Sequence, residues 1–228
     1  MILKKYEDIP DEIKNSEVKK YYDILSKKKI SLFLKRLVDI FLSLIMLIVL
    51  SPVMLILAIV IKIDSKGPVF YRQERITQYG KTFRIFKFRT MVQDADKRGA
   101  LVTKQGDSRI TRVGNKIRKC RLDEFPQLIN ILKGEMSFVG TRPEVKKYVD
   151  MYTDEMKATL LMPAGVTSMA SIKFRDEDEI IEEYTKKGEE IDEIYVKRIL
   201  PEKMKWNLEY IEKVNILEDL KICIKTVI

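Results

Sequence analysis

The sequence predicts a mainly helical α+β protein with a long apolar helix near its N-terminus and a small globular domain after it. Residues 40–61 contain no charged side chain, and the chain beyond them alternates short β-prone stretches with longer helical ones. We expect three parts: a charged arm over residues 1–34, a membrane helix over residues 35–64 and a globular domain over residues 65–228.

The composition indicates an anionic partner and excludes histidine chemistry. The chain has 43 Lys and Arg residues against 34 Asp and Glu residues, a formal net charge of +9. This charge suits phosphorylated substrates, an anionic bilayer or nucleic acid. The sequence has no histidine, and its two cysteines show no metal-ligand spacing. Any metal is therefore expected to be bound by oxygen ligands, as Mg²⁺ is.

The apolar run is long enough to cross a bilayer, for which roughly 20 apolar residues are needed. Lys and Arg flank the run on both sides, a pattern typical of cytoplasmic flanks. A re-entrant helix broken at Ser51-Pro52 would keep both ends on that face. Pro52 removes a backbone donor, and Ser51 can bond a backbone group that the proline leaves free. A kinked single-pass helix and a buried core helix of a soluble protein are the alternatives.

The segments on either side of the membrane helix have simpler patterns. The arm ends in three lysines and is expected to be amphipathic or loosely ordered on an anionic membrane surface. Beyond the helix, we expect strands over 69–73, 82–89 and 166–174, a polar loop over 93–107, and helices over 110–120, 123–133, 145–161 and most of the chain after 176. Trp206 and Tyr210 suit either a membrane interface or the core.

Asp123 and Glu124 are the acidic residues that best suit chemistry. They are adjacent at an expected helix start, with Arg118, Lys119 and Arg121 close in sequence. Cations and a helix N-terminus both favour ionised carboxylates. Such a carboxylate can attack phosphorus, and a neighbouring one can bind a metal beside a diphosphate. The ordinary alternative is a helix N-cap with acids in the first turn.

Basic side chains that could bind phosphate are spread along the domain. Phosphoryl transfer depends on positioning and charge stabilisation, and arginine holds phosphate through paired hydrogen bonds. Arg142 lies between Gly140 and Pro143, in a loop that could present it to an anion. The further candidates are Lys87, Arg89 and Arg118, and for each the alternative is solvated surface charge. Interleaved aromatic residues could stack on nucleic acid, but no nucleic-acid motif accompanies them, so we expect no such partner.

The order and spacing of these segments resemble the monotopic phosphoglycosyl transferases, the bacterial sugar transferase family. The resemblance runs from Lys35 to near the C-terminus. The ordered set is specific, although no single piece of it is. It consists of Lys35-Arg36-x-x-Asp39, Ser51-Pro52, Gly67-Pro68-Val69-Phe70, Arg72-Gln73-Glu74-Arg75, Lys87-Phe88-Arg89-Thr90-Met91, Leu122-Asp123-Glu124, residues 127–140 and Arg142-Pro143.

The resemblance implies a re-entrant helix and a small cytoplasmic domain with interfacial helices. It also implies that Asp123 is a nucleophile and that Glu124, with Asp123, binds Mg²⁺. Arg118 and Arg142 match basic residues that bind nucleotide sugar or phosphate, and Lys87 matches more weakly. Arg89 and Arg175 complete the expected substrate-binding set. The cluster expected at the membrane interface consists of Lys35, Arg36 and Asp39.

The implied reaction moves a sugar-1-phosphate from a UDP-sugar to polyprenol (undecaprenyl) phosphate through a phosphosugar-aspartyl intermediate. UMP leaves, and the reaction is the first membrane step of glycoconjugate assembly. The expected location is the cytoplasmic face of the bacterial cell membrane, with the phospholipid bilayer as a partner and a homodimer allowed. The alternatives are a glycosyltransferase that releases UDP and a non-catalytic basic protein of the membrane surface. Departures from the family pattern at Thr141 and in residues 164–168 and 171–176 leave the sugar open.

Overall fold

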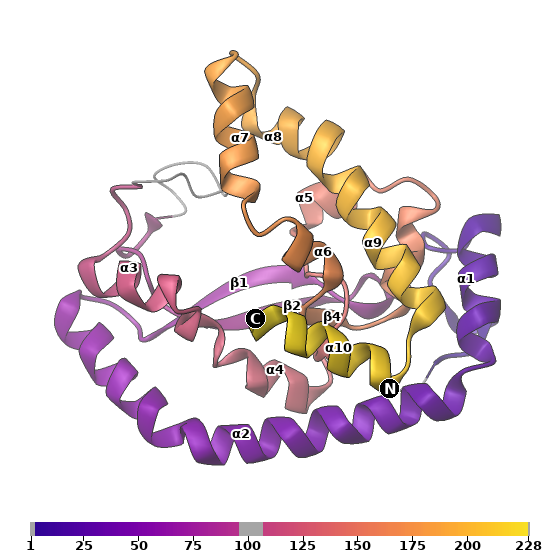
Figure 1. The fold of residues 1–228 in the computed structure, drawn as a ribbon, viewed down its shortest axis with the longest axis horizontal. Helices are drawn as coiled ribbons and strands as arrows, with labels where there is room; N and C mark the ends of the chain where they lie inside the picture. Colours follow the sequence, from indigo (N-terminus) through magenta and orange to yellow (C-terminus); the bar gives the residue numbers. More distant parts are fainter. Residues whose placement is uncertain (1–2, 96–106, 228) are drawn as a thin grey trace.

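The computed structural model of the chain describes residues 3–95 and 107–227. These residues form a mainly helical fold with short strands, as predicted, and the strands pair into two small two-stranded sheets. The long helix α2 (Lys29–Asp64) runs beneath the domain, and the sheets and most other helices lie above it (Figure 1). The predicted polar loop over residues 93–107 lies mainly outside the described residues.

Helix α2 continues through Pro52 without interruption, which corrects the predicted break. Its 36 residues give a length of about 54 Å at 1.5 Å per residue, and its axis curves (Figure 1). Pro52 leaves the carbonyl of Ile48 without its backbone donor, and the hydroxyl of Ser51 donates to that oxygen at 2.8 Å. The helix can continue because the freed acceptor has found a partner within the same turn.

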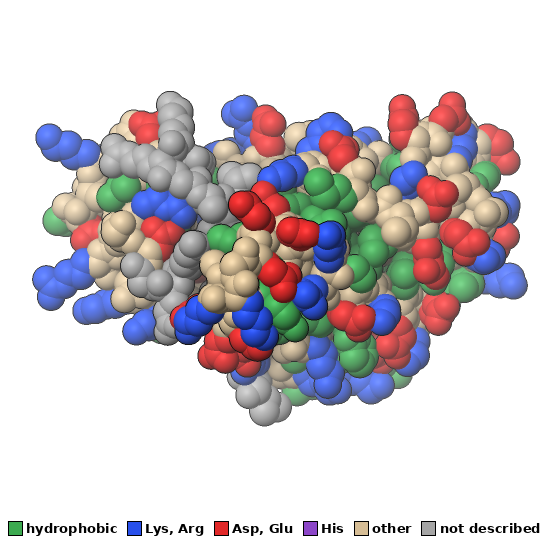
Figure 2. Space-filling model, turned by 90° about the horizontal axis from the view of Figure 1, so that it is seen from above, with side chains coloured by type: hydrophobic (Ala, Val, Ile, Leu, Met, Phe, Trp, Pro, Cys, Tyr) green, Lys and Arg blue, Asp and Glu red, His purple; other side chains and the backbone are tan. Residues whose placement is uncertain are grey.

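One face of α2 packs against the domain, and its other faces are exposed and apolar. The buried positions recur at helical spacing and are Leu32, Lys35, Asp39, Ser43 and Ile61. Between them, Leu47, Leu50, Met54, Leu57 and Ala58 pack against the smaller apolar clusters of the domain. The length and composition of the helix allow it to cross a membrane. Only 6% of its most apolar window is buried inside the molecule. The helix is therefore not the core helix of a soluble protein. The opposite face of the molecule carries a mixture of acidic and basic side chains (Figure 2).

The N-terminal arm, expected to be amphipathic or loosely ordered on a membrane surface, is instead ordered and packs its apolar residues on the domain. It forms the 3₁₀ turn η1 (Tyr6–Asp8) and the helix α1 (Ser16–Ser26), which lies against η5 (Met156–Leu161) and α9 (Leu200–Lys213). Its buried apolar residues, which belong to the main core, are Ile9, Ile13, Val18 and Leu25. Helix α2 then begins at Lys29, inside the stretch expected to be the arm.

The first sheet confirms two predicted strands, whereas the second overlaps another only at its first two residues, 166 and 167. Strands β1 (Phe70–Ile76) and β2 (Thr82–Phe88) pair antiparallel. Strands β3 (Met136–Val139) and β4 (Ala164–Thr167) pair parallel. The expected strand over 166–174 ends early because Ser168 Oγ accepts from the backbone N–H of Ser171 at 2.9 Å and caps α6 (Met169–Lys173).

Of the helices predicted around the acidic pair, one agrees with its prediction and two are interrupted. Helix α3 (Arg112–Lys119) agrees with its prediction, whereas the helix expected over 123–133 is split into η4 (Leu122–Glu124) and α4 (Gln127–Lys133). The one expected over 145–161 is reduced to α5 (Lys146–Val149) and η5, because Thr153 Oγ1 accepts from the N–H of Met156 and begins a new turn.

The C-terminal region is helical, as predicted. Its elements are α7 (Glu177–Lys186), α8 (Ile191–Ile194), a π-helical turn η6 (Tyr195–Ile199), α9 and α10 (Ile216–Val227). Tyr210 is a core residue, and the half-buried Trp206 has the ammonium of Lys173 over its ring.

Ser51→Ala should lower the free energy of unfolding by about 1–2 kcal/mol, because it leaves the Ile48 carbonyl without a partner in an apolar surrounding. Thermal unfolding in detergent micelles would measure the loss. In a Pro52→Ala background the backbone N–H of residue 52 can bond that carbonyl, so the same serine substitution should cost little. Equal losses in both backgrounds would contradict this account of the helix.

Candidate active site

Asp123 and Glu124 lie in η4, the tight turn between α3 and α4. Arg121, directly before this turn, has a left-handed backbone with φ of 52°, which is uncommon for a residue other than glycine. Helix α4 begins only at Gln127, so Asp123 is not the cap of an α-helix. The ordinary alternative from the sequence, an N-cap role for Asp123, is therefore wrong.

Glu124 lies between two cations from distant segments. Its Oε1 is 3.1 Å from Lys87 Nζ on β2 and 3.5 Å from Arg142 Nη2 in the loop after β3. Burial acts to raise the pKa of Glu124, but Lys87 and Arg142 outweigh it and bring the pKa down to about 2. Glu124 is consequently ionised at neutral pH. The side chain of Arg142 remains 38% exposed, which leaves it accessible to a ligand.

The two adjacent carboxylates have opposite electrostatic surroundings. Burial raises the pKa of Asp123; Lys87 opposes this, and the charge of Glu124 adds to it. Burial disfavours the charged form of Lys87 as well and therefore lowers its pKa, although the charge of Glu124 partly offsets that effect. Neighbouring carboxylates whose pKa values are pushed apart commonly take different roles in catalysis. Here Glu124 is the charge that organises the cations, and Asp123 is the more basic group.

The loop that carries Arg142 is fixed at the end of the parallel sheet. The N–H of Gly140 donates to the carbonyl of Thr167 at 3.0 Å, and the N–H of Gly165 donates to the carbonyl of Thr141 at 2.8 Å. A Cβ atom on Gly140 would lie 2.6 Å from the carbonyl oxygen of Pro163, so this close approach of the two strands requires glycine. The loop therefore holds Arg142 on a rigid support.

The other predicted substrate-binding residues are placed differently. Arg118 is in the last turn of α3, where its charge acts to lower the pKa of Asp123. Arg175 is exposed on the link between α6 and α7, and within the described chain no ion pair joins it to Glu124.

Arg89 has partners that do not support its predicted role in substrate binding. It is 5% exposed, and its guanidinium donates to the carbonyls of Lys66, of Ser65 at 2.7 Å and of Ile61 at 3.5 Å. These carbonyls lie at the C-terminal end of α2 and just beyond it. In this structure Arg89 is thus a cap for the apolar helix.

The cluster predicted at the membrane interface fastens α2 to the domain. Lys35 Nζ is 2.6 Å from Asp219 Oδ2 on α10. Arg36 donates to the carbonyls of Ile131 at 2.6 Å and Leu132 at 2.9 Å, both in α4. Asp39 Oδ1 accepts from the N–H of Phe138 on β3 at 3.1 Å. The helix α4 follows the acidic pair and the strand β3 precedes Arg142, so these contacts link α2 to both sides of the site.

The acidic pair suits Mg²⁺ if a substrate supplies phosphate ligands as well. Among residues 3–95 and 107–227, no three Asp, Glu, Cys or His side chains form a cluster that could hold a metal on their own. Mg²⁺ is commonly bound through one or two carboxylates together with substrate phosphates, which is what Asp123 and Glu124 could provide. The printed contacts of both cations are with Oε1 of Glu124, so the carboxylate is already held at the place where such a ligand would be needed.

Known proteins match the chain over most of its length. A family model described as bacterial sugar transferase matches residues 30–228. UDP-N-acetylgalactosamine-undecaprenyl-phosphate N-acetylgalactosaminephosphotransferase of Aeromonas hydrophila is 48% identical over 99 residues, which are 43% of this chain and 23% of that protein.

Two further relatives are named UDP-glucose:undecaprenyl-phosphate glucose-1-phosphate transferase. The one from Escherichia coli (strain K12) is 36% identical over 75% of this chain and 34% of its own length. The one from Caulobacter vibrioides is 33% identical over 75% of this chain and 59% of its own length. The chain thus spans between 23% and 59% of the length of the three relatives described.

Arg89→Met should destabilise the protein by at least about 2 kcal/mol, because several helix-end carbonyls lose a charged donor. Arg175→Met removes an exposed arginine and should leave the thermal midpoint within experimental error of the parent. Differential scanning fluorimetry in detergent compares the two. A parent-like midpoint for Arg89→Met would show that its contacts do not hold the end of α2.

Proposed function

The chain belongs to the bacterial sugar transferase family, and we propose that it transfers a sugar-1-phosphate from a UDP-sugar to polyprenol (undecaprenyl) phosphate. The observation that carries this proposal is the Asp123-Glu124 pair, with Glu124 held between Lys87 and Arg142 in a domain that rests on an exposed apolar helix. A soluble anionic donor and a membrane-bound phosphate could meet at such a site. The names of the relatives support the reaction class.

The proposed topology is re-entrant, with both ends of α2 on the cytoplasmic face of the bacterial membrane. Leu32 and Lys35 near its first turn and Ile61 near its last turn are all buried against the one domain. A straight crossing would place the two ends on opposite sides of a hydrocarbon layer roughly 30 Å thick. One set of these contacts would then have to break. The Lys and Arg residues at both flanks of the apolar run support the same topology.

In the proposed reaction, a carboxylate oxygen of Asp123 attacks the phosphorus that bears the sugar. The bond from this phosphorus to the bridging oxygen breaks, and UMP leaves with the electron pair. An oxygen of polyprenol phosphate then attacks the same phosphorus. Its bond to Asp123 breaks, which regenerates the carboxylate and gives a diphosphate-linked lipid sugar. Lys87 and Arg142 would stabilise the charge on the transferring group.

Asp123 and Glu124 are the residues that would hold Mg²⁺, which when bound would neutralise part of the charge of the diphosphate. Before the donor arrives, Glu124 occupies Lys87 and Arg142. An incoming phosphate would compete with Glu124 for Lys87 and Arg142. It could contact both cations at once, because they approach Glu124 from different segments of the chain. The relatives are named for N-acetylgalactosamine and for glucose, so the sugar is best sought among several UDP-sugars.

Asp123→Asn should lower turnover on the order of 10³-fold or more, because an amide cannot replace the carboxylate nucleophile. UMP release from UDP-N-acetylgalactosamine and UDP-glucose, with polyprenol phosphate in micelles, gives the rate. The exposed Asp150→Asn is the matched control and should retain the parent activity. Release of UDP by the parent would instead support the glycosyltransferase alternative, and full activity of Asp123→Asn would refute the nucleophile.

Incubation with the UDP-sugar in the absence of acceptor should leave a sugar phosphate on the protein. Intact-protein mass spectrometry should show the added mass, and peptide mapping should place it at Asp123. Excess UMP should remove it by reversal, and polyprenol phosphate should remove it by transfer. If metal is present and no adduct forms on rapid quenching, the covalent route is wrong.

A further inference from the structure

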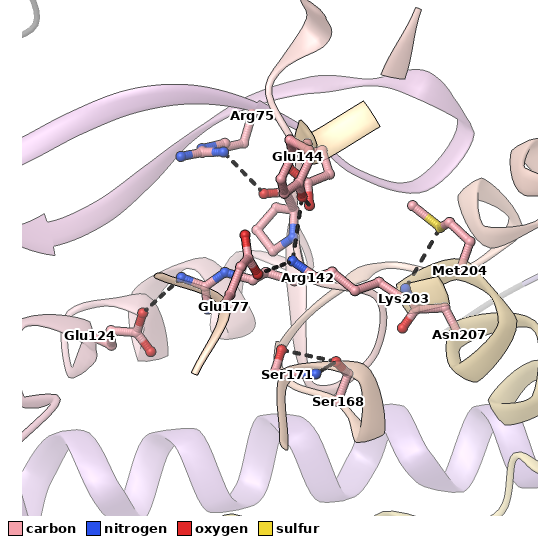
Figure 3. Close-up of polar contacts among 12 residues, drawn as sticks. Arg75, Glu124, Arg142, Glu144, Ser168, Ser171, Glu177, Lys203, Met204 and Asn207 are labelled. Atoms are coloured by element: carbon pink, nitrogen blue, oxygen red, sulfur yellow. Dashed lines mark hydrogen bonds and ion pairs between the residues drawn. The ribbon is translucent and has the colours of Figure 1, made fainter. Parts of the chain in front are cut away.

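A ladder of charged and polar side chains continues from Arg142 on the side away from Glu124 (Figure 3). Glu177, at the start of α7, is the next carboxylate, and its Oε2 is 2.8 Å from Lys203 Nζ on α9. The same ammonium donates to the hydroxyl of Tyr195 at 3.4 Å. The Tyr195 hydroxyl donates in turn to Glu144 Oε1 at 2.6 Å. No part of this ladder was predicted from the sequence.

The ladder returns to the segment that presents Arg142, since Glu144 lies two residues after it. The backbone of this segment is also held from β1, where the guanidinium of Arg75 donates to the carbonyl of Pro143 at 3.4 Å. The N–H of Ile76 donates to the carbonyl of Glu144 at 2.9 Å. The ladder therefore reaches the backbone next to Arg142 through Glu144, and the charge of Glu177 acts on the Arg142 guanidinium at longer range.

Lys203 is the member whose burial most needs an explanation. It is 4% exposed, as is Tyr195, and Glu144 is 7% exposed. A buried ammonium is costly unless it is paired and hydrogen-bonded, and an apolar residue of similar size often serves stability as well or better. Tyr195 is the first residue of a π-helical turn, an element that occurs frequently at functional sites. These features indicate a role for Lys203 beyond packing.

Three carboxylates attract Arg142. Glu124 is the nearest, at 3.5 Å, and the charges of Glu144 and Glu177 act from farther away (Figure 3). Lys203 neutralises Glu177, which leaves the guanidinium of Arg142 directed toward Glu124. Without Lys203, Glu177 would lose its ion-pair partner, and its charge would draw Arg142 away from the acidic pair.

We propose that Lys203 is a positioning residue of the site, which keeps Arg142 available to the donor phosphates by holding the charge of Glu177. The inference rests on the proposed function, because it assigns a role in binding a nucleotide diphosphate sugar. Lys203 itself does not contact the reacting atoms. Its role is exerted through Glu177 on one side and through Tyr195 and Glu144 on the other.

Lys203→Met should raise the KM for the UDP-sugar about tenfold to a hundredfold, the equivalent of one hydrogen bond to a charged group, with a smaller change in kcat. The double variant Lys203→Met/Glu177→Gln should return KM to within about threefold of the parent, because the competing charge is gone. Lys203→Arg should also restore it. Lys213→Met removes an exposed pair with Glu209 on the same helix and is the matched control.

KM, kcat and the thermal midpoint are measured for each variant, because together they separate a positioning role of Lys203 from a structural one. A lowered midpoint with an unchanged KM would show that Lys203 is structural. A double variant as impaired as the single one would overturn the competition for Arg142. If Lys203→Met fails to fold, Tyr195→Phe tests the same ladder and should raise KM several-fold, and an unchanged KM would overturn the proposal.

The proposed function can fail separately. If the parent releases no UMP, binding of the UDP-sugar by titration calorimetry replaces KM as the readout. Weaker binding by Lys203→Met, restored in the double variant, would support the positioning role although the transfer reaction was wrong. Equal binding by all three proteins would overturn the positioning role.

Discussion

The attachment of an apolar helix to a charged domain is the constraint on which the rest of the molecule depends. At the N-terminal part of α2, Lys35 and Asp39 are buried and bonded to α10 and β3. At the other end, Arg89 holds the helix terminus through backbone carbonyls. Burial of ionised groups is tolerated only where each finds a partner, so these contacts fix the height and register of the helix against the domain. The site is built on the same elements.

Charge neutralisation organises the site itself in the same way. Glu124 pairs with Lys87 from β2 and with Arg142 from the loop after β3, and Glu177 and Lys203 extend the alternation of charges into the domain. Every charge in this series has an opposite charge beside it, which limits the cost of burial. Under the proposed function, an anionic ligand would compete for cations that are already in place, which lowers the cost of ordering side chains on binding.

The sequence was sufficient to predict features encoded by neighbouring residues, and insufficient for those made by distant ones. The apolar run, the β1–β2 pair and the acidic pair all have local patterns, and the structure has them where expected. The continuity of α2 past Pro52 depends on one hydroxyl, and the roles of Arg89, Asp219 and Lys203 depend on partners far along the chain. The apolar positions of the arm were missed because surrounding lysines dominate its composition.

The packed arm has a consequence for anyone who recombines this protein with its relatives. The family match begins at residue 30, yet Ile9, Ile13, Val18 and Leu25 complete the largest apolar cluster of the domain. A chimera joined at residue 30 would expose the apolar surface of α9 and η5 that the arm covers in this protein. Its donor sequence would have to bring four apolar side chains of its own to the same places, or the hybrid would tend to self-associate.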